Sequence, residues 1–570
     1  MRQFVAAALA LAMLAGCAQA PRRPVQHTPT LVPQPLARVA LAPGPGQPIA
    51  ADLLQAEFAL ARNDLRTAAA ATARAASLSA DPALAGRAVA LAVAVHDAPL
   101  ATQMLARWQA LGAAPDPLAA ARAQLALDQG DRAAAERQLD AVIAVGGSNA
   151  WRDALRVLAA ARDPALAGVV LEHLATPARL PGNDGAVWLA ASQLGAQLGR
   201  RIWARRLAAA TLTRFGSAAS FGWSAQMAQQ AGDARAAEAT LRAGLARHPR
   251  SIPLRMAMAG LLSARGDNTA AQRLLAQPPQ DADTYAARAA YAARADDRKA
   301  LAAIYAQLGR APVAARRPNL FLLGQLAELL GRRQSALDWY AQVGDEDAHG
   351  FDAAVRRVVL LSELGRPQQA QTLLHGLQTD YADAPKASLK LLMLEAELDV
   401  RARRYAEAVA VYGRALQRSP DDPALLYARG VAAAEAGALD LAVADLSRVL
   451  KLKPDDINAM NALGFTLADA GRDLAEAERL VAAAHRSRPD DPAITDSWGW
   501  VQFRLGRLAE SERSLRKAWD KSKDAEIGAH LAAVLWAQGR RAEARAVLMQ
   551  AQRIDPHSRS VHALQRRWGT

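Results

Sequence analysis

From residue 49 onward, apolar residues recur at intervals of three and four positions, with charged residues between them. This is the period of an amphipathic helix that buries one face. The runs LALDQGDRAAAERQL (125–139) and LADAGRDLAEAERLV (467–481) each hold two such segments on either side of a glycine. The pattern predicts pairs of amphipathic helices joined by short turns.

The turn signals return at a nearly constant spacing. Their successive separations are 33, 34, 65, 34, 72, 34, 35 and 33 residues. The strong signals are Gly199-Arg200, Gly232-Asp233, Gly266-Asp267, Gly331-Arg332, Gly365-Arg366, Gly437-Ala438, Gly471-Arg472, Gly506-Arg507 and Gly539-Arg540. Weaker signals complete the series at Asn63-Asp64, His96-Asp97, Gly130-Asp131, Arg162-Asp163, Ala295-Asp296 and Arg403-Arg404. From Asn63 to Gly539 the chain covers 476 residues in fourteen intervals, which is 34 residues per unit.

Other residue types keep a fixed distance from these turns. A small residue stands five positions after most of them, where it would let the two helices of a pair approach closely. These residues are Ala68, Ala135, Ala204, Ala237, Ala271, Ala336, Ala370, Ala408, Ala442 and Ala544. Proline stands seventeen positions after several turns, where it would end the second helix. These prolines are Pro249, Pro420, Pro454 and Pro556, with Pro489 one position later because of a one-residue insertion near Asp473.

The start of the following helix is marked as well. Asp422, Asp456 and Asp491 stand where an N-cap belongs, and Pro423 and Pro492 occupy the first helical position after two of them.

A period of 34 with these residues resembles the tetratricopeptide repeat, most specifically over residues 386–556. The resemblance implies an all-α fold, a tetratricopeptide-type α-solenoid of about fifteen helix pairs in a superhelix. We assign residues 49–310 to degenerate repeats and residues 311–570 to regular ones. The long interval before Arg403 predicts a four-residue loop insertion within GLQTDYADAP (376–385).

The N-terminal residues have the pattern of a targeting signal. Arg2 precedes an apolar run, and Leu14-Ala15-Gly16-Cys17 follows, in the order of a secretory signal peptide. The ending resembles the bacterial lipobox, so residues 1–16 are expected to be removed and Cys17 to be acylated. Ala18 takes the place of the Asp that retains lipoproteins in the inner membrane under the enterobacterial sorting rule. The resemblance therefore implies a lipid anchor at the periplasmic face of the outer membrane.

Residues 17–48 form the lipidated tether. Its stretch 18–48 holds eight prolines and no acidic residue, and it shows no helical period. Proline-rich chain of this kind stays extended and could reach on the order of 90 Å from the membrane.

Composition excludes several classes of site. The chain has one cysteine, so it can form neither an intrachain disulfide nor a metal site of several cysteines. Its net charge is +14, but the periplasmic address argues against nucleic acid as a partner. Motifs of nucleophile elbows, phosphate loops, dinucleotide sites and zinc helices are missing from the sequence. We expect no enzyme activity, no catalytic residue, no cofactor and no metal.

Aromatic residues, only 5% of the chain, gather on one predicted face of the C-terminal units. In tetratricopeptide units, the positions about three, six and ten residues before the turn face the concave groove. Here the residues near those positions are Tyr427, Phe465, Trp500, Phe503 and Trp536. Such side chains supply much contact energy at interfaces, so they are candidate partner-binding residues. Packing between neighbouring pairs explains them equally well, and the sequence leaves both interpretations open.

The C-terminal run also resembles a narrower family. Its segments NALGFTLADAGRDLAEAERL (461–480), DSWGWVQFRLGRLAESERSLRKAW (496–519) and AHLAAVLWAQGRRAEARAVL (529–548) are similar to a large proteobacterial outer-membrane lipoprotein with many tetratricopeptide repeats. In pseudomonads that lipoprotein is the adaptor of a periplasmic carboxyl-terminal-processing serine protease. The resemblance implies that the chain binds the protease, promotes its assembly and presents peptidoglycan hydrolases for degradation.

Two other functions remain open at this stage. One is a structural role in outer-membrane assembly or polysaccharide export, and the other is a peptidoglycan-binding or cell-division scaffold.

Overall fold

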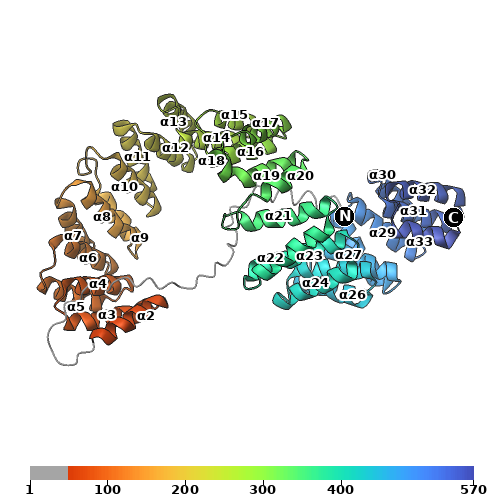
Figure 1. Ribbon diagram of the computed structural model, residues 1–570, viewed down its shortest axis with the longest axis horizontal. Helices are drawn as coiled ribbons and strands as arrows, with labels where there is room; N and C mark the ends of the chain where they lie inside the picture. Colours follow the sequence, from red (N-terminus) through yellow and green to blue (C-terminus); the bar gives the residue numbers. More distant parts are fainter. Residues whose placement is uncertain (1–48, 570) are drawn as a thin grey trace. The chain divides into compact units, whose positions relative to one another are not determined.

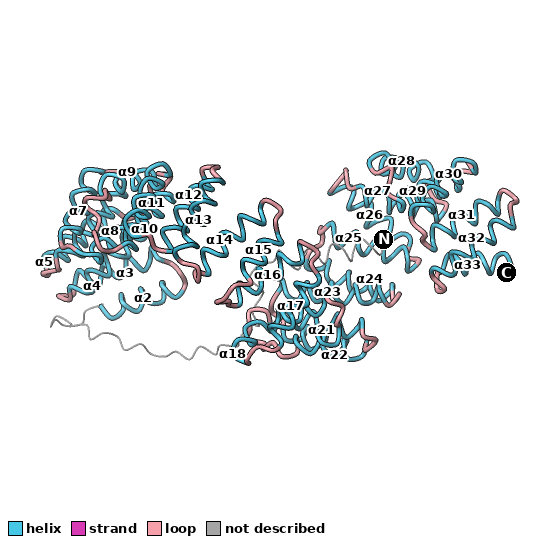
Figure 2. Tube along the Cα trace, turned by 90° about the horizontal axis from the view of Figure 1, so that it is seen from above, coloured by secondary structure: helices cyan, strands magenta, loops and turns pink. Residues whose placement is uncertain are grey.

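A computed structural model describes residues 49–569 of the chain. These residues form α-helices and one short 3-10 turn, and no strand is found among them (Figure 2). The prediction of an all-α fold is therefore confirmed. No helix in this range is both long and apolar enough to cross a membrane.

The described residues divide into two compact units, and the boundary between them in the sequence lies between Gln307 and Leu308. The helices up to residue 309 are α2 (Ile49–Ala61), α3 (Leu65–Leu78), α4 (Pro82–Ala94), α5 (Ala98–Ala110), α6 (Pro115–Asp128), α7 (Arg132–Ala144), α8 (Gly147–Ala159), α9 (Pro164–Leu174), α10 (Gly185–Gln197), α11 (Arg201–Phe215), α12 (Ala218–Gln230), α13 (Ala234–Arg247), α14 (Ile252–Ala264), α15 (Asn268–Leu275), α16 (Ala282–Arg294) and α17 (Arg298–Gly309). The helices after it are α18 (Val313–Arg316), the 3-10 turn η1 (Arg317–Asn319), α19 (Leu320–Leu329), α20 (Arg333–Tyr340), α21 (Gly350–Glu363), α22 (Pro367–Asp380), α23 (Pro385–Arg401), α24 (Tyr405–Arg418), α25 (Pro423–Ala436), α26 (Leu439–Leu452), α27 (Ile457–Ala470), α28 (Leu474–Ser487), α29 (Pro492–Arg504), α30 (Leu508–Lys521), α31 (Ala525–Ala537), α32 (Arg541–Ile554) and α33 (Arg559–Trp568).

Within each unit, consecutive helices pair and successive pairs stack in series (Figure 1). Helices α2 to α17 make eight pairs and α19 to α32 make seven, which confirms the prediction of about fifteen pairs. Helix α33 stands alone at the end and packs on α31 as the first helix of a further pair would.

The turn inside most pairs depends on a residue in the left-handed conformation. Gly437 has φ of +80° and Gly506 has φ of +82°, a region that side chains with a Cβ rarely adopt. At the first of these turns, the Ala438 N–H donates to the Ala433 carbonyl at 2.8 Å and so satisfies the end of the helix.

The weaker turns show where the prediction holds and where it fails. Asn63, His96 and Arg403 take the left-handed conformation at the predicted positions. At Ala295-Asp296 the prediction is one residue early, because Asp296 is the left-handed residue. The second helix of the pair before this turn, α15, has only eight residues, which shortens the interval. The turn at Arg162-Asp163 has no left-handed residue, although Asp163 caps the next helix.

Close helix crossings confirm the predicted role of the small residues. The ten predicted alanines are all buried, with at most 3% of their surface exposed. First helices also carry a glycine at the crossing, which the sequence analysis did not single out. A Cβ on Gly499 would lie 2.7 Å from the Leu515 side chain, so α29 and α30 touch through backbone at this point.

The predicted helix ends are confirmed as well. Pro249, Pro420, Pro454, Pro489 and Pro556 each follow the residue that caps a second helix. The carboxylates of Asp422, Asp456 and Asp491 accept backbone N–H groups at 2.8–3.3 Å, as N-caps do.

The predicted loop insertion is wrong. The loop from Tyr381 to Ala384 is of ordinary length, and the extra residues lengthen α23 to 17 residues. The segment contains no helix breaker after Pro385, so the added residues continue the helix instead of leaving it.

A large side chain at Ala442 tests the proposed packing register. Ala442 is fully buried on α26, so Ala442→Trp should overpack the crossing and destabilise the adjoining pairs by about 3 kcal/mol. Ala444 lies on the same helix but is exposed, so Ala444→Trp is the matched control. Thermal unfolding followed by circular dichroism should show an early transition for the first variant alone. Equal melting curves for the two variants would show that the register is wrong.

Candidate protein-docking surface

Three predicted aromatic residues meet around a buried histidine in the C-terminal pairs. The Trp500 ring stacks on the His530 ring, with centroids 4.1 Å apart. Phe503 lies 5.0 Å from Trp500, and Phe465 lies 5.8 Å from His530. We call these four residues the aromatic cluster.

The repeat itself brings the aromatic cluster together. Phe465 stands six residues before Gly471 on α27, and Trp500 stands six residues before Gly506 on α29. Because first helices stack side by side, equal positions in successive units become neighbours. The cluster thus crosses three first helices, α27, α29 and α31.

An ion pair holds the base of the cluster. His530 Nδ1 lies 3.0 Å from both carboxylate oxygens of Asp496, and each of the two residues is only 6% exposed. Burial by itself would lower the pKa of His530, but the charge and hydrogen bonds of Asp496 outweigh it and raise that pKa to about 9. The imidazole is therefore charged at neutral pH and donates its Nδ1–H to the carboxylate.

Acidic groups border the cluster on one side. The Trp500 indole N–H donates to Asp469 Oδ1 at 3.1 Å, which fixes the orientation of the ring. Glu526 as a whole residue is exposed. The loss of water around its carboxyl group is nevertheless the main cause that raises its pKa to about 7. His530 acts against this rise, whereas Asp496 and Glu435 add to it.

Trp536 lies outside the aromatic cluster and packs against a different helix. Its ring stacks on Trp568 of α33, with centroids 4.1 Å apart and planes 5° from parallel. The guanidinium groups of Arg541 and Arg545 lie 5.4 and 5.7 Å from its ring centre. Trp536 thus joins the last helix to the array.

Tyr427 lies outside the aromatic cluster and packs among aliphatic side chains on α25. Burial is the main cause that raises the pKa of its phenol, with the charge of Asp456 as a second cause.

All five predicted aromatic residues are half-buried. Each ring therefore has neighbours in the fold and also a solvent-facing part. Their role in binding a partner stays a prediction. Cys17, the predicted lipidation site, lies outside the described residues.

Sequence reasoning missed His530 and Asp496. A signal was present, because the two residues are 34 positions apart, one repeat length, and Asp496 stands ten residues before Gly506. A histidine and an aspartate one repeat apart on neighbouring first helices are placed to form an ion pair.

Long-range contacts close this part of the array on itself. Arg403 donates to the His557 carbonyl at 2.7 Å and to the Asp555 carboxylate at 3.0 Å, across more than 150 residues. Arg559 donates to the Glu435 carbonyl at 2.7 Å. Arg403 does so from a left-handed turn position, where arginine is an uncommon choice. The end of the array is thereby held against the turn between α23 and α24 and the end of α25.

Within residues 49–569, no three His, Cys, Asp or Glu side chains are grouped so that they could hold a metal ion.

The ion pair predicts how stability depends on pH. The folded pKa of His530, about 9, exceeds its ordinary value of 6.5. The contribution of charged His530 to the free energy of unfolding is therefore complete below pH 6.5 and is lost as the pH rises through about 9. The raised pKa of Glu526 acts in the same direction between pH 4.5 and about 7.

Melting temperatures measured between pH 5 and 9.5 should fall across this range. Asp496→Asn should remove the decline above about pH 7, where only His530 contributes, and should destabilise the fold at pH 7 by about 3 kcal/mol. Asp440→Asn, which alters an exposed ion pair with Arg472, should keep the wild-type profile. A profile for Asp496→Asn that parallels the wild type would contradict the charged state assigned to His530.

Comparison with known proteins identifies repeats in two parts of the chain. Models of the tetratricopeptide repeat match residues 393–457, from α23 to the start of α27, and residues 502–567, from the end of α29 into α33. A curated relative, TPR repeat-containing protein PA4667 from Pseudomonas aeruginosa, is 32% identical over 211 residues. The match covers 37% of this chain and 35% of the relative, so the chain spans about a third of the relative's length.

Solved structures that align with this chain share little sequence with it. The Naa15/Naa10 complex bound to HypK-THB aligns over 88% of this chain and 89% of its own, at 15% identity and a TM-score of 0.38. TTC0263, a thermophilic tetratricopeptide-repeat protein of Thermus thermophilus, aligns over 31% of this chain and 95% of its own, at 22% identity and a TM-score of 0.28.

The two matched stretches of this chain are thus tetratricopeptide repeats, an arrangement that generally serves as a scaffold for binding other proteins.

Proposed function

We propose that this chain is a lipid-anchored adaptor on the periplasmic face of the outer membrane, whose C-terminal repeats dock a carboxyl-terminal-processing serine protease. In this role it promotes assembly of the protease and brings peptidoglycan hydrolases to it. The observation that carries the proposal is the aromatic cluster, a set of half-buried aromatic rings packed against a buried ion pair.

A fixed set of exposed aromatic faces is well suited to docking. Trp500 is held by its stack on His530 and by its hydrogen bond to Asp469. Because its position is already fixed, its solvent-facing side can contact a partner with little further loss of entropy. Tryptophan and phenylalanine contribute much of the energy at interfaces of this kind.

The proposals of a lipid anchor and of a protease partner are supported by the sequence. The lipobox at Leu14 to Cys17 supports lipidation, and the segments between residues 461 and 548 support the protease as the partner. The relative PA4667 shares repeats with this chain, and its name records nothing about a partner.

Replacing Cys17 tests the anchor. Cys17→Ser removes the thiol that would be acylated, so the folded protein should leave the outer-membrane fraction and become soluble. Fractionation with metabolic labelling by a fatty acid checks this outcome. An acylated variant that remains in the outer membrane would rule out Cys17 as the anchor.

Truncating Trp500 tests the docking surface. Trp500→Ala should weaken binding of the purified protease from the same organism about thirtyfold, the effect of losing about 2 kcal/mol of contact energy. Trp498→Ala is the matched control, because Trp498 lies on the same helix and stacks on His485 instead. Biolayer interferometry gives the affinities, and circular dichroism confirms that both variants keep their helices.

Trp536→Ala provides a second variant, because its loss leaves the contact between Trp500 and His530 intact. If the wild-type chain binds the protease and all three variants bind equally, the aromatic cluster is not the docking surface. If the wild-type chain does not bind the protease, that partner is wrong. Capture of barrel-assembly, export or divisome proteins in its place would favour the alternative functions.

A further inference from the structure

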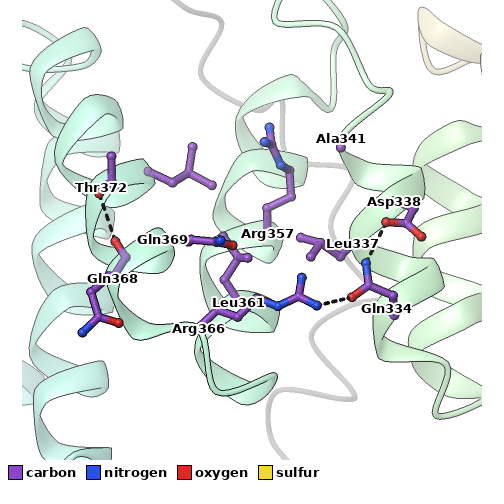
Figure 3. Close-up of a pocket in the computed structure, with 11 residues that line it drawn as sticks. Gln334, Leu337, Asp338, Ala341, Arg357, Leu361, Arg366, Gln368, Gln369 and Thr372 are labelled. Carbon is purple, nitrogen blue, oxygen red and sulfur yellow. Dashed lines mark hydrogen bonds between the residues drawn. The ribbon is translucent and has the colours of Figure 1, made fainter.

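A cavity of about 650 Å³ opens between the second helices α20 and α22 (Figure 3). Leu337 of α20 and Leu361 of α21 contribute apolar surface to it, and Gln334 and Gln369 contribute amides. The cavity belongs to helices distinct from those of the aromatic cluster.

Arg357 of α21 also lines this cavity. Its hydrogen bonding differs from that of Arg356, the residue before it. Arg356 is paired with the Glu328 carboxylate, which also accepts the Tyr340 hydroxyl at 2.7 Å. Arg357 makes no hydrogen bond or ion pair in the described part of the chain, and its Nε–H is buried without an acceptor.

This state is unusual among the arginines of residues 49–569. Arg107, Arg255 and Arg288 also have a buried Nε without an acceptor, yet each places other guanidinium nitrogens on oxygen atoms. Arg107 reaches the Ser79 carbonyl at 2.9 Å, and Arg288 reaches the Gln280 amide oxygen at 2.6 Å. A buried donor with no acceptor is costly, and none of residues 49–569 supplies an acceptor or a countercharge to Arg357.

The remaining charges of the cavity leave Arg357 unbalanced. Arg366 donates to Gln334 Oε1 at 2.9 Å, and the Gln334 amide donates to Asp338 Oδ1 at 2.8 Å (Figure 3). Asp338 is thus joined to Arg366 through the glutamine. The lining carries two guanidinium groups and one carboxylate, so one positive charge is left over.

We propose that this cavity binds an acidic side chain, Asp or Glu, of an extended segment of a partner protein. A guanidinium pairs with a carboxylate through two parallel hydrogen bonds, and the terminal nitrogens of Arg357, which are not buried as its Nε is, can make them. The leucines beside it suit an apolar residue next to the acidic one. The site is separate from the proposed protease-docking surface, so either proposal can fail without the other.

A synthetic peptide of alternating Gly, Leu and Glu, acetylated and amidated at its ends, is the probe. Fluorescence anisotropy with the full chain measures its binding against the same peptide with Gln in place of Glu. The Glu peptide should bind at least about tenfold more tightly, as expected for a charge-assisted hydrogen-bonded pair. Arg357→Gln should remove this difference.

Two further variants keep the test specific. Arg486 is exposed on α28 and has no hydrogen bond or ion pair to another of residues 49–569, so Arg486→Gln is the matched control and should retain the difference. Gln369→Glu should place a carboxylate within the cavity, pair with Arg357 and block the Glu peptide while the chain stays folded. Melting curves confirm that each variant is folded.

Three results would overturn the proposal. They are no binding of the Glu peptide at millimolar concentration, equal binding of the two peptides, or a preference that survives in Arg357→Gln. The last result would mean that the overall charge of +14 attracts the peptide without a site.

Discussion

The close contact between the two helices of each pair is the constraint on which the rest of the structure depends. Where Gly499 meets Leu515, the helices touch with no room for a Cβ, and the buried alanine that follows most turns keeps the same spacing elsewhere. Such contact fixes the angle of each pair. Each pair in turn fixes which residues of the next pair become neighbours, so one local contact, repeated every 34 residues, sets the positions of distant side chains.

This constraint explains how much of the fold could be predicted from the sequence. Turns, alanines, caps and helix-ending prolines are each read from a residue and its immediate neighbours, and the structure confirms most of them. The errors fall where a unit changes length. Before Asp296 the second helix of the preceding pair, α15, is short, and before Arg403 the extra residues extend α23. In both places the length of a helix sets the position of the next turn, and no turn residue in the sequence signals that length.

The candidate surface was predictable only in part. Position before the turn brought Phe465, Trp500 and Phe503 together as expected, whereas Trp536 packs against α33 and Tyr427 lies apart. The ion pair beneath the cluster escaped prediction because it joins two units. Neither Asp496 nor His530 is distinctive within its own repeat, and only their separation by one repeat length connects them. The contact of Arg403 with Asp555 joins more distant units and has no signal in the sequence.

Together these features describe an array of helix pairs that positions aromatic side chains in its C-terminal repeats. Hydrogen exchange of the full chain, alone and saturated with its proposed partner, a carboxyl-terminal-processing protease, tests this account most directly. Binding of the protease should slow exchange in peptides that cover the first helices α27, α29 and α31, and should leave exchange in the second helices α28 and α30 little changed. Protection confined to the repeats before residue 308, or none in these three helices, would contradict it.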